Sequence, residues 1–72
     1  MRKRSVIIPN RHNTSISLED EFMQELELIA IMENKTVNQL VTEIDSERTS
    51  PNLSSAIRIY ILEYIKQKNT EH

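Results

Sequence analysis

The chain has 72 residues, no cysteine and a formal net charge of −2. A chain of this length forms a single domain that buries only about 60% of its unfolded surface. Small domains compensate for a marginal core with disulfides, a bound metal or a partner chain. The absence of cysteine excludes disulfides and cysteine-based zinc sites, and His12 and His72 lack the spacing of metal ligands. We therefore expect oligomerisation, and no metal or other cofactor.

The apolar segments are too short for a membrane. Residues 6–8 are followed directly by Pro9, so they are shorter than the apolar region of a signal peptide. The longest apolar run, residues 28–32, cannot cross a bilayer. We expect a soluble, cytoplasmic protein without a membrane partner.

The charge is unevenly distributed along the chain. Four of the nine basic residues lie within residues 1–12, which contain no acidic residue. This segment therefore carries +4, whereas the rest of the chain carries −6. A basic segment joined to an acidic body is typical of an arm that binds nucleic acid or a membrane surface. We expect residues 1–12 to form a basic N-terminal arm.

Two segments near the N-terminus have the composition of β-strands. Residues 4–8 are rich in β-branched side chains and form a weak candidate. Residues 14–18 alternate, with Ile16 and Leu18 on one face and serines on the other, which is the pattern of a half-buried strand. This strand either forms a hairpin with residues 4–8 or pairs with the same strand of a second chain. The apolar helices that follow favour the second arrangement.

Three helical segments follow the strands. The first begins at Glu19, with three acidic residues in its first turn, and ends at Asn34, a residue type that tolerates the left-handed conformation. The second begins at Thr36 with the Thr-x-x-Gln pattern of a capping box. The third begins near Asn52, and we expect residues 69–72 to be frayed. The predicted fold is mostly α, with one N-terminal strand that pairs across a homodimer, and three helices.

Apolar residues of the strand and of two helices define the expected core. They recur at helical spacing in the first and third helices. The second half of the first helix is apolar on nearly all sides, which is more apolar surface than a small monomer can cover. The residues expected in a dimer core are Ile16, Leu18, Phe22, Leu26, Ile29, Leu53, Ile57, Tyr60 and Ile61.

No arrangement of residues in the sequence indicates catalysis. A serine nucleophile requires a base held nearby. His12 lies in the basic arm, His72 is the last residue, and the carboxylates are spread along helix faces. We expect neither enzymatic activity nor a small-molecule substrate.

Two groups of polar residues are candidates for DNA contact. A two-stranded antiparallel ribbon fits the major groove, where its outward side chains reach base edges. The expected base contacts share one parity of the strand and are Arg11, Asn13, Ser15 and Ser17. A helix start binds phosphate through backbone N–H groups, and a basic arm adds charge. The expected phosphate contacts are Arg2, Lys3, Arg4, Asn52, Ser54 and Ser55. A solvent-exposed strand face and ordinary helix capping remain open as explanations of the same residues.

Several separated blocks of the sequence resemble a family of short bacterial ribbon-helix-helix proteins. The blocks are residues 3–6, 14–22, 37–45 and 52–58, and they follow the order found in that family. The wider superfamily, which includes Arc- and MetJ-type repressors, pairs one strand from each of two chains. The resemblance implies an obligate homodimer, and we expect that this homodimer can assemble further on DNA. It also implies base contacts by Asn13, Ser15 and Ser17, and a helix start that anchors phosphate.

The resemblance leaves two points open. The superfamily pattern has two helices after the strand, so the phosphate-binding helix begins at either Thr36 or Asn52, and the matching block favours Asn52. Met23 stands where the family pattern has an aromatic residue, and Asn10 stands near a glycine of the turn. The second departure leaves the conformation of residues 9–13 undefined.

The leading interpretation is a homodimeric, sequence-specific transcriptional regulator of the repressor type that binds double-stranded DNA. Its ribbon-helix-helix domain would span residues 13–68. One alternative is the antitoxin of a toxin–antitoxin pair, although the four polar residues after the last helix offer little surface for a toxin. A second alternative is a protein-interaction adaptor, which would not need the basic arm or the polar strand face.

Overall fold

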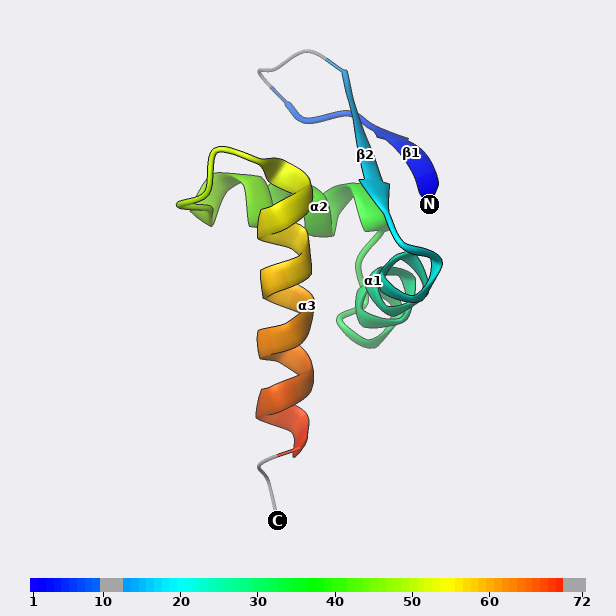
Figure 1. Cartoon of the computed structure of the whole chain (residues 1–72), viewed down its shortest axis with the longest axis vertical. Helices are drawn as coiled ribbons and strands as arrows, with labels where there is room; N and C mark the ends of the chain where they lie inside the picture. Colours follow the sequence, from blue (N-terminus) through cyan, green and yellow to red (C-terminus); the bar gives the residue numbers. More distant parts are fainter. Residues whose placement is uncertain (10–12, 70–72) are drawn as a thin grey trace.

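The computed structural model describes residues 1–9 and 13–69 of the chain. A two-stranded antiparallel ribbon is followed by three helices (Figure 1). The elements are β1 (Arg2–Val6), β2 (Thr14–Leu18), α1 (Asp20–Met32), α2 (Val37–Glu47) and α3 (Leu53–Asn69). The predicted mostly helical fold with an N-terminal ribbon and three helices is therefore confirmed.

The ribbon forms within one chain. Val6 lies opposite Thr14, and Arg2 lies opposite Leu18. This is the hairpin alternative, so the expectation of a single strand that pairs across a dimer is corrected. The first strand also begins at Arg2, two residues before the weak strand expected at residues 4–8. The hairpin is favoured because it satisfies the backbone groups of both strands and leaves Val6 only 1% exposed. Residues 2–6 of the expected basic N-terminal arm thus form a strand.

The alternation expected for β2 is confirmed. Ile16 and Leu18 are fully buried on the side of the helices, whereas Ser15 is exposed. The period of two along a strand places successive side chains on opposite faces, so burial of the apolar pair fixes which face the serines occupy.

Local hydrogen bonds fix the ends of the helices. Asn34, just after α1, has φ 59°, the left-handed conformation expected for a residue that ends a helix. At the start of α2, the Thr36 hydroxyl accepts the Gln39 N–H, and the Gln39 side chain accepts the Thr36 N–H. The predicted capping box is therefore confirmed.

The core lies between the inner face of the ribbon and the three helices. Six of the nine residues expected in a dimer core are buried within the single chain: Ile16, Leu18, Leu26, Ile29, Ile57 and Ile61. The remaining three are half-buried against the core: Phe22, Leu53 and Tyr60. Met23, which replaces the expected aromatic residue, is 1% exposed and fills the core with a flexible side chain.

The helices leave part of their apolar surface uncovered. The exposed apolar side chains of α1 and α3 are Leu28, Ile31, Met32, Ile59 and Leu62, and their exposed fractions range from 47% to 73%. Figure 1 shows that α3 follows the longest axis of the molecule, and that its C-terminal half extends away from the ribbon. As expected, the described residues of one chain leave apolar side chains of two helices uncovered. Within the same residues, no helix combines the length and the apolar character that crossing a membrane requires.

Candidate nucleic-acid interface

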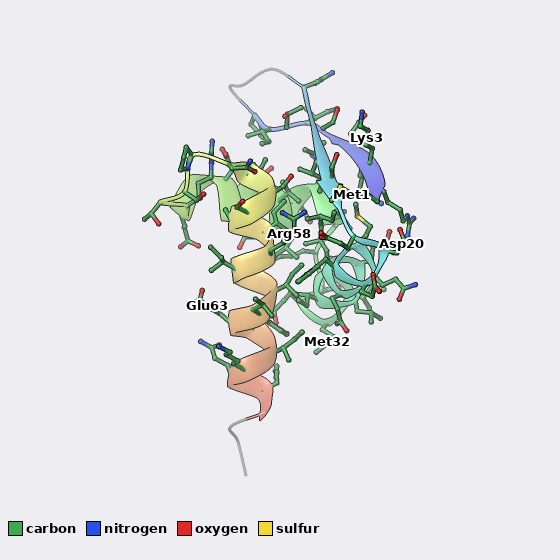
Figure 2. The ribbon with its side chains drawn as sticks, in the orientation of Figure 1. Met1, Lys3, Asp20, Met32, Arg58 and Glu63 are labelled. Carbon is green, nitrogen blue, oxygen red and sulfur yellow. The ribbon has the colours of Figure 1, made fainter. Side chains whose placement is uncertain are left out.

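The hairpin places polar side chains from both strands on its outer face. Directly opposed residues of an antiparallel pair project to the same face. Lys3 lies opposite Ser17, and Ser5 lies opposite Ser15. These four residues are therefore on the face opposite to Ile16, and we call them the outer ribbon face. Figure 2 shows Lys3 on the side of β1 away from the helices.

The outer ribbon face contains one residue that the sequence pattern did not identify. Ser5 joins the face because the hairpin register sets it across from Ser15. The expected base contacts Ser15 and Ser17 are brought together there, and Lys3, expected at phosphate, lies beside them. No local pattern in residues 2–6 reveals which side chains face outward, because basic residues occupy both parities. Only the pairing with β2 supplies this information.

Arg4 occupies the opposite face of the ribbon. It lies across from the buried Ile16, and its Nη1 is 3.3 Å from Oε2 of Glu27 on α1. The Arg4 side chain is 43% exposed. The phosphate contact expected for Arg4 is therefore in competition with an ion pair inside the chain, and the side chain is directed towards α1.

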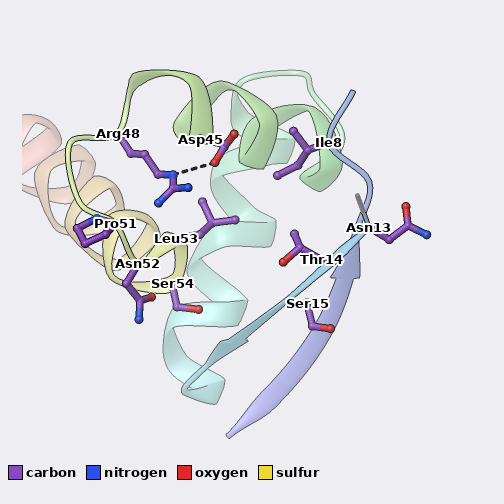
Figure 3. A pocket seen from close by; sticks show the side chains of 10 residues that line it. All are labelled: Ile8, Asn13, Thr14, Ser15, Asp45, Arg48, Pro51, Asn52, Leu53 and Ser54. Carbon is purple, nitrogen blue, oxygen red and sulfur yellow. Dashed lines mark hydrogen bonds and ion pairs between the residues drawn. The ribbon is translucent and has the colours of Figure 1, made fainter. Parts of the chain in front are cut away.

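The residues that precede β2 extend the polar side of the ribbon. Asn13 is exposed and points away from the helices, whereas the neighbouring Thr14 points towards Leu53 (Figure 3). Asn13 thus continues the parity of Ser15. Arg11, the fourth expected base contact, lies outside the described residues.

The start of α3 lies next to β2. The Asn52 side chain caps this helix, since its Oδ1 accepts the Ser55 N–H at 3.2 Å. The Ser54 hydroxyl oxygen accepts the Ser17 N–H at 3.3 Å. Two residues expected at phosphate therefore also have structural roles, one in capping and the other in attachment of the ribbon.

An open groove separates the ribbon from the start of α3 (Figure 3). Its lining residues are Ile8, Asn13, Thr14, Ser15, Asp45, Arg48, Pro51, Asn52, Leu53 and Ser54. Arg48 lines one side of this groove and bonds to two neighbouring residues. Its Nε is 2.8 Å from Oδ1 of Asp45, and its Nη1 donates to the Ser50 carbonyl at 2.8 Å. These bonds fix the connector that leads into α3, so the start of α3 has a defined position relative to the ribbon.

The start of α2 is attached to the segment that follows β1. The Asn38 side chain accepts the Ile7 N–H at 2.8 Å and donates to the Ile7 carbonyl at 2.6 Å. Thr36 and Gln39 close the same helix end through the capping box. The polar side chains at the start of α2 are thus used within the chain.

Arg58 on α3 connects to the end of β2. Its Nε donates to Oε1 of Glu19 at 2.9 Å, and its Nη2 is 3.5 Å from the Ser17 carbonyl oxygen. The hydrogen bond from Arg58 lowers the pKa of Glu19 below its ordinary value. This carboxylate is therefore ionised at neutral pH, and Arg58 joins α3 to the junction between β2 and α1.

The geometry defines a small helical domain with an exposed, polar and basic β-ribbon beside a helix start. Among the described residues, no group of three or more His, Cys, Asp or Glu side chains is arranged to hold a metal ion. Comparison with protein families matches residues 1–65 to the family described as the ribbon-helix-helix domain. The chain belongs to this family. Comparison with curated proteins and with solved structures gives no match.

Proposed function

We propose that the protein is a homodimeric, sequence-specific DNA-binding regulator of transcription whose β-ribbon enters the major groove. The main support for this proposal is the composition of the outer ribbon face, where Lys3 lies across from Ser17 and Ser5 lies across from Ser15. A two-stranded ribbon has the dimensions to enter the major groove, and its outward side chains then meet base edges. Ribbon-helix-helix domains occur generally in DNA-binding regulators and antitoxins, and they are typically not enzymes.

The proposed base contacts come from the ribbon and from the residues before β2. Asn forms paired hydrogen bonds with adenine, and serine hydroxyls donate to or accept from several bases. Asn13, Ser15 and Ser17 carry this role as expected from the sequence, and Ser5 is added by the hairpin register. Arg11 is included only because it has the same parity in the sequence as Asn13, Ser15 and Ser17. Arginine there would recognise guanine.

The proposed phosphate contacts are the start of α3 and the cations of β1. The start of α3 supplies backbone N–H groups and the side chains of Asn52, Ser54 and Ser55, and the helix dipole favours an anion there. We prefer α3 to α2 because the start of α3 lies beside the ribbon. Arg2 and Lys3 supply charge from β1, whereas Arg4 is left out because it pairs with Glu27.

The proposed homodimer would cover the exposed apolar side chains of α1 and α3. Leu28, Ile31 and Met32 on α1, and Ile59 and Leu62 on α3, are each about half exposed or more. Burial of such side chains contributes about 25 cal/mol per Å² of apolar area, which a small domain needs. In this dimer each protomer keeps its own hairpin. The proposed role places the protein in the cytoplasm of a bacterium, beside its DNA.

The same apolar side chains favour one second candidate, an antitoxin whose helices bind a partner of different sequence. An antitoxin and a homodimeric repressor differ in what covers α1 and α3, while both use the outer ribbon face on DNA. The mass of the protein in solution separates them, because a homodimer has twice the 8.5 kDa mass of the chain without any second component.

Lys3 and Arg4 offer a matched test of the proposed function. Lys3→Met and Arg4→Met each remove one positive charge from neighbouring positions of β1, but only Lys3 lies on the outer ribbon face. Affinity for a random-sequence duplex would be measured by fluorescence anisotropy at several NaCl concentrations. We expect Lys3→Met to reduce the slope of log K against log[salt] by about 0.9, the value for one phosphate contact.

The Arg4→Met variant serves as the control for lost net charge. Its slope should change by less than half as much, because the Arg4 side chain is directed to Glu27. Equal changes in both variants would mean that net charge alone governs binding, and the assigned face would be wrong. Unchanged affinity in Lys3→Met would remove Lys3 from the interface.

A further inference from the structure

The backbone of Ser17 is attached to α3 on the edge of β2 that faces away from β1. Its N–H donates to the Ser54 hydroxyl at 3.3 Å, and its carbonyl oxygen is 3.5 Å from Nη2 of Arg58. In an antiparallel pair, the N–H and C=O of one residue point to the same edge. Both polar backbone groups of Ser17 are therefore held by one helix, and a strand edge that would otherwise be open is partly covered there.

Arg58 extends this attachment beyond the strand. Its Nε donates to Oε1 of Glu19, the residue that precedes α1, at 2.9 Å. One guanidinium thus bonds the last part of β2 and the residue after it, which a single-point cation such as lysine cannot reproduce. We call Ser17, Glu19, Ser54 and Arg58 the Ser17 clamp. Figure 2 shows Arg58 on the side of α3 that faces β2 and α1.

The Ser17 clamp joins the two halves of the candidate interface. Ser17 and Ser15 belong to the outer ribbon face, and Ser54 lies two residues after Asn52 at the start of α3. Phosphate contacts position a protein on DNA, whereas base contacts read the sequence. The reading of bases therefore depends on a fixed offset between the ribbon and the helix start, and the Ser17 clamp is the direct bond between them.

We propose that Ser54 and Arg58 are positioning residues for sequence recognition. They hold the ribbon at a set offset from the phosphate anchor, so that Ser15 and Ser17 meet the intended base pairs when α3 is docked on the backbone. This inference rests on the proposed DNA-binding function and adds to it the residues that set specificity without touching a base. Loss of the clamp should therefore lower discrimination between sequences more than it lowers affinity for DNA in general.

The test compares two affinities for each variant of the full chain. Duplexes retained by the wild type would be selected from a random pool, and Kd would be measured for the enriched duplex and for the unselected pool. Ser54→Ala removes the hydroxyl that accepts from Ser17, and Arg58→Lys keeps the charge but not the forked geometry. We expect each variant to lose about tenfold in affinity for the enriched duplex, comparable to one good base contact. For Arg58→Lys, affinity for the unselected pool should stay within about twofold because the charge and the phosphate contacts remain. Ser54→Ala also removes a proposed phosphate contact, so its decisive measurement is the hydrogen exchange described next.

Ser46→Ala is the matched control. The Ser46 hydroxyl donates to the Glu43 carbonyl within α2, away from the ribbon, so its loss should change neither affinity. Amide hydrogen exchange of the free protein provides a measurement that does not involve DNA. In Ser54→Ala the Ser17 amide should exchange faster, while a core amide such as that of Leu26 keeps its protection, which separates a lost clamp from unfolding.

The possible outcomes are distinct. If both affinities fall by the same factor in Arg58→Lys, or if neither falls, Ser54 and Arg58 do not set specificity and the inference is overturned. If the Ser17 amide exchanges at the same rate in Ser54→Ala, the clamp does not hold the strand. If the wild type binds neither the enriched duplex nor the pool, the proposed function itself fails, because that result concerns the unmodified protein.

Discussion

Two ion pairs of nearly equal length should differ greatly in their contribution to stability. Arg48 Nε lies 2.8 Å from Asp45, whose side chain is 5% exposed, while the Arg48 side chain is 20% exposed. Lys35 Nζ lies 2.7 Å from Glu43, and these side chains are 31% and 51% exposed. Removal of one partner is costly only where the remaining charge is withdrawn from water. Arg48→Met should therefore destabilise the protein much more than Lys35→Met.

The magnitude follows from the burial. Breaking a fully buried pair costs about 3–5 kcal/mol, and the partial exposure of Arg48 reduces this to about 2–3 kcal/mol. A domain of this size has a free energy of unfolding of about 4–11 kcal/mol, so the Arg48→Met variant still folds. With a urea m-value of about 1 kcal/mol/M, the unfolding midpoint should fall by about 2–3 M. Lys35→Met should change the free energy of unfolding by at most about 1 kcal/mol, the upper end for exposed pairs.

Urea unfolding followed by circular dichroism at one protein concentration measures both variants. The fixed concentration matters because the stability of the proposed dimer would depend on it. The double variant Asp45→Leu/Arg48→Met removes both charges, and it should be more stable than Arg48→Met alone. If Arg48→Met and Lys35→Met lower the midpoint equally, or if the double variant is the least stable, then burial does not determine how much these ion pairs contribute to stability.

Substitutions at four further positions test separate features of the fold. Asn34→Gly should maintain or slightly raise the free energy of unfolding because φ is 59° at this position. Asn34→Val should lower the free energy of unfolding by about 1 kcal/mol or more. Thr36→Ala should cost about 1 kcal/mol in urea unfolding through loss of the capping box. Ile31→Lys places a charge at a 73% exposed position, so sedimentation should show the proposed dimer shifting to monomer while helical content stays the same. The hydrogen bond from Arg58 lowers the pKa of Glu19. The stabilisation from this bond is therefore present above the ordinary carboxyl pKa and is lost as the pH falls through the lowered pKa. An NMR titration of the Glu19 carboxyl carbon should give a lower pKa in the wild type than in Arg58→Met.

Local sequence patterns predicted the elements that local physics determines. The parity of Ile16 and Leu18, the left-handed Asn34 and the capping box of Thr36 each depend on a few neighbouring residues, and each is confirmed. The core positions of α1 and α3 were also predictable, because their apolar side chains recur at helical spacing.

Local patterns could not predict which residues pair across the ribbon, or which residues of α3 contact β2 and Glu19. The hairpin register, which places Ser5 on the outer ribbon face, joins residues that are 8 to 16 positions apart. The contacts of Ser54 with Ser17 and of Arg58 with Glu19 span 37 and 39 positions. No periodicity encodes such contacts, since they arise only when packing has set the helices against the ribbon.

Binding of the wild-type chain to a random-sequence duplex, measured as salt is raised, tests most directly whether the ribbon is a DNA-binding surface. Fluorescence anisotropy of a labelled duplex would be recorded from low NaCl upward, for the wild type and for the triple variant Arg2→Ala/Lys3→Ala/Arg4→Ala. We predict binding at low salt that weakens linearly in log K against log[salt], with a shallower slope in the triple variant. The absence of any affinity of the wild type at low salt, or an affinity that salt does not change, would contradict the assignment of the ribbon as a DNA-binding surface.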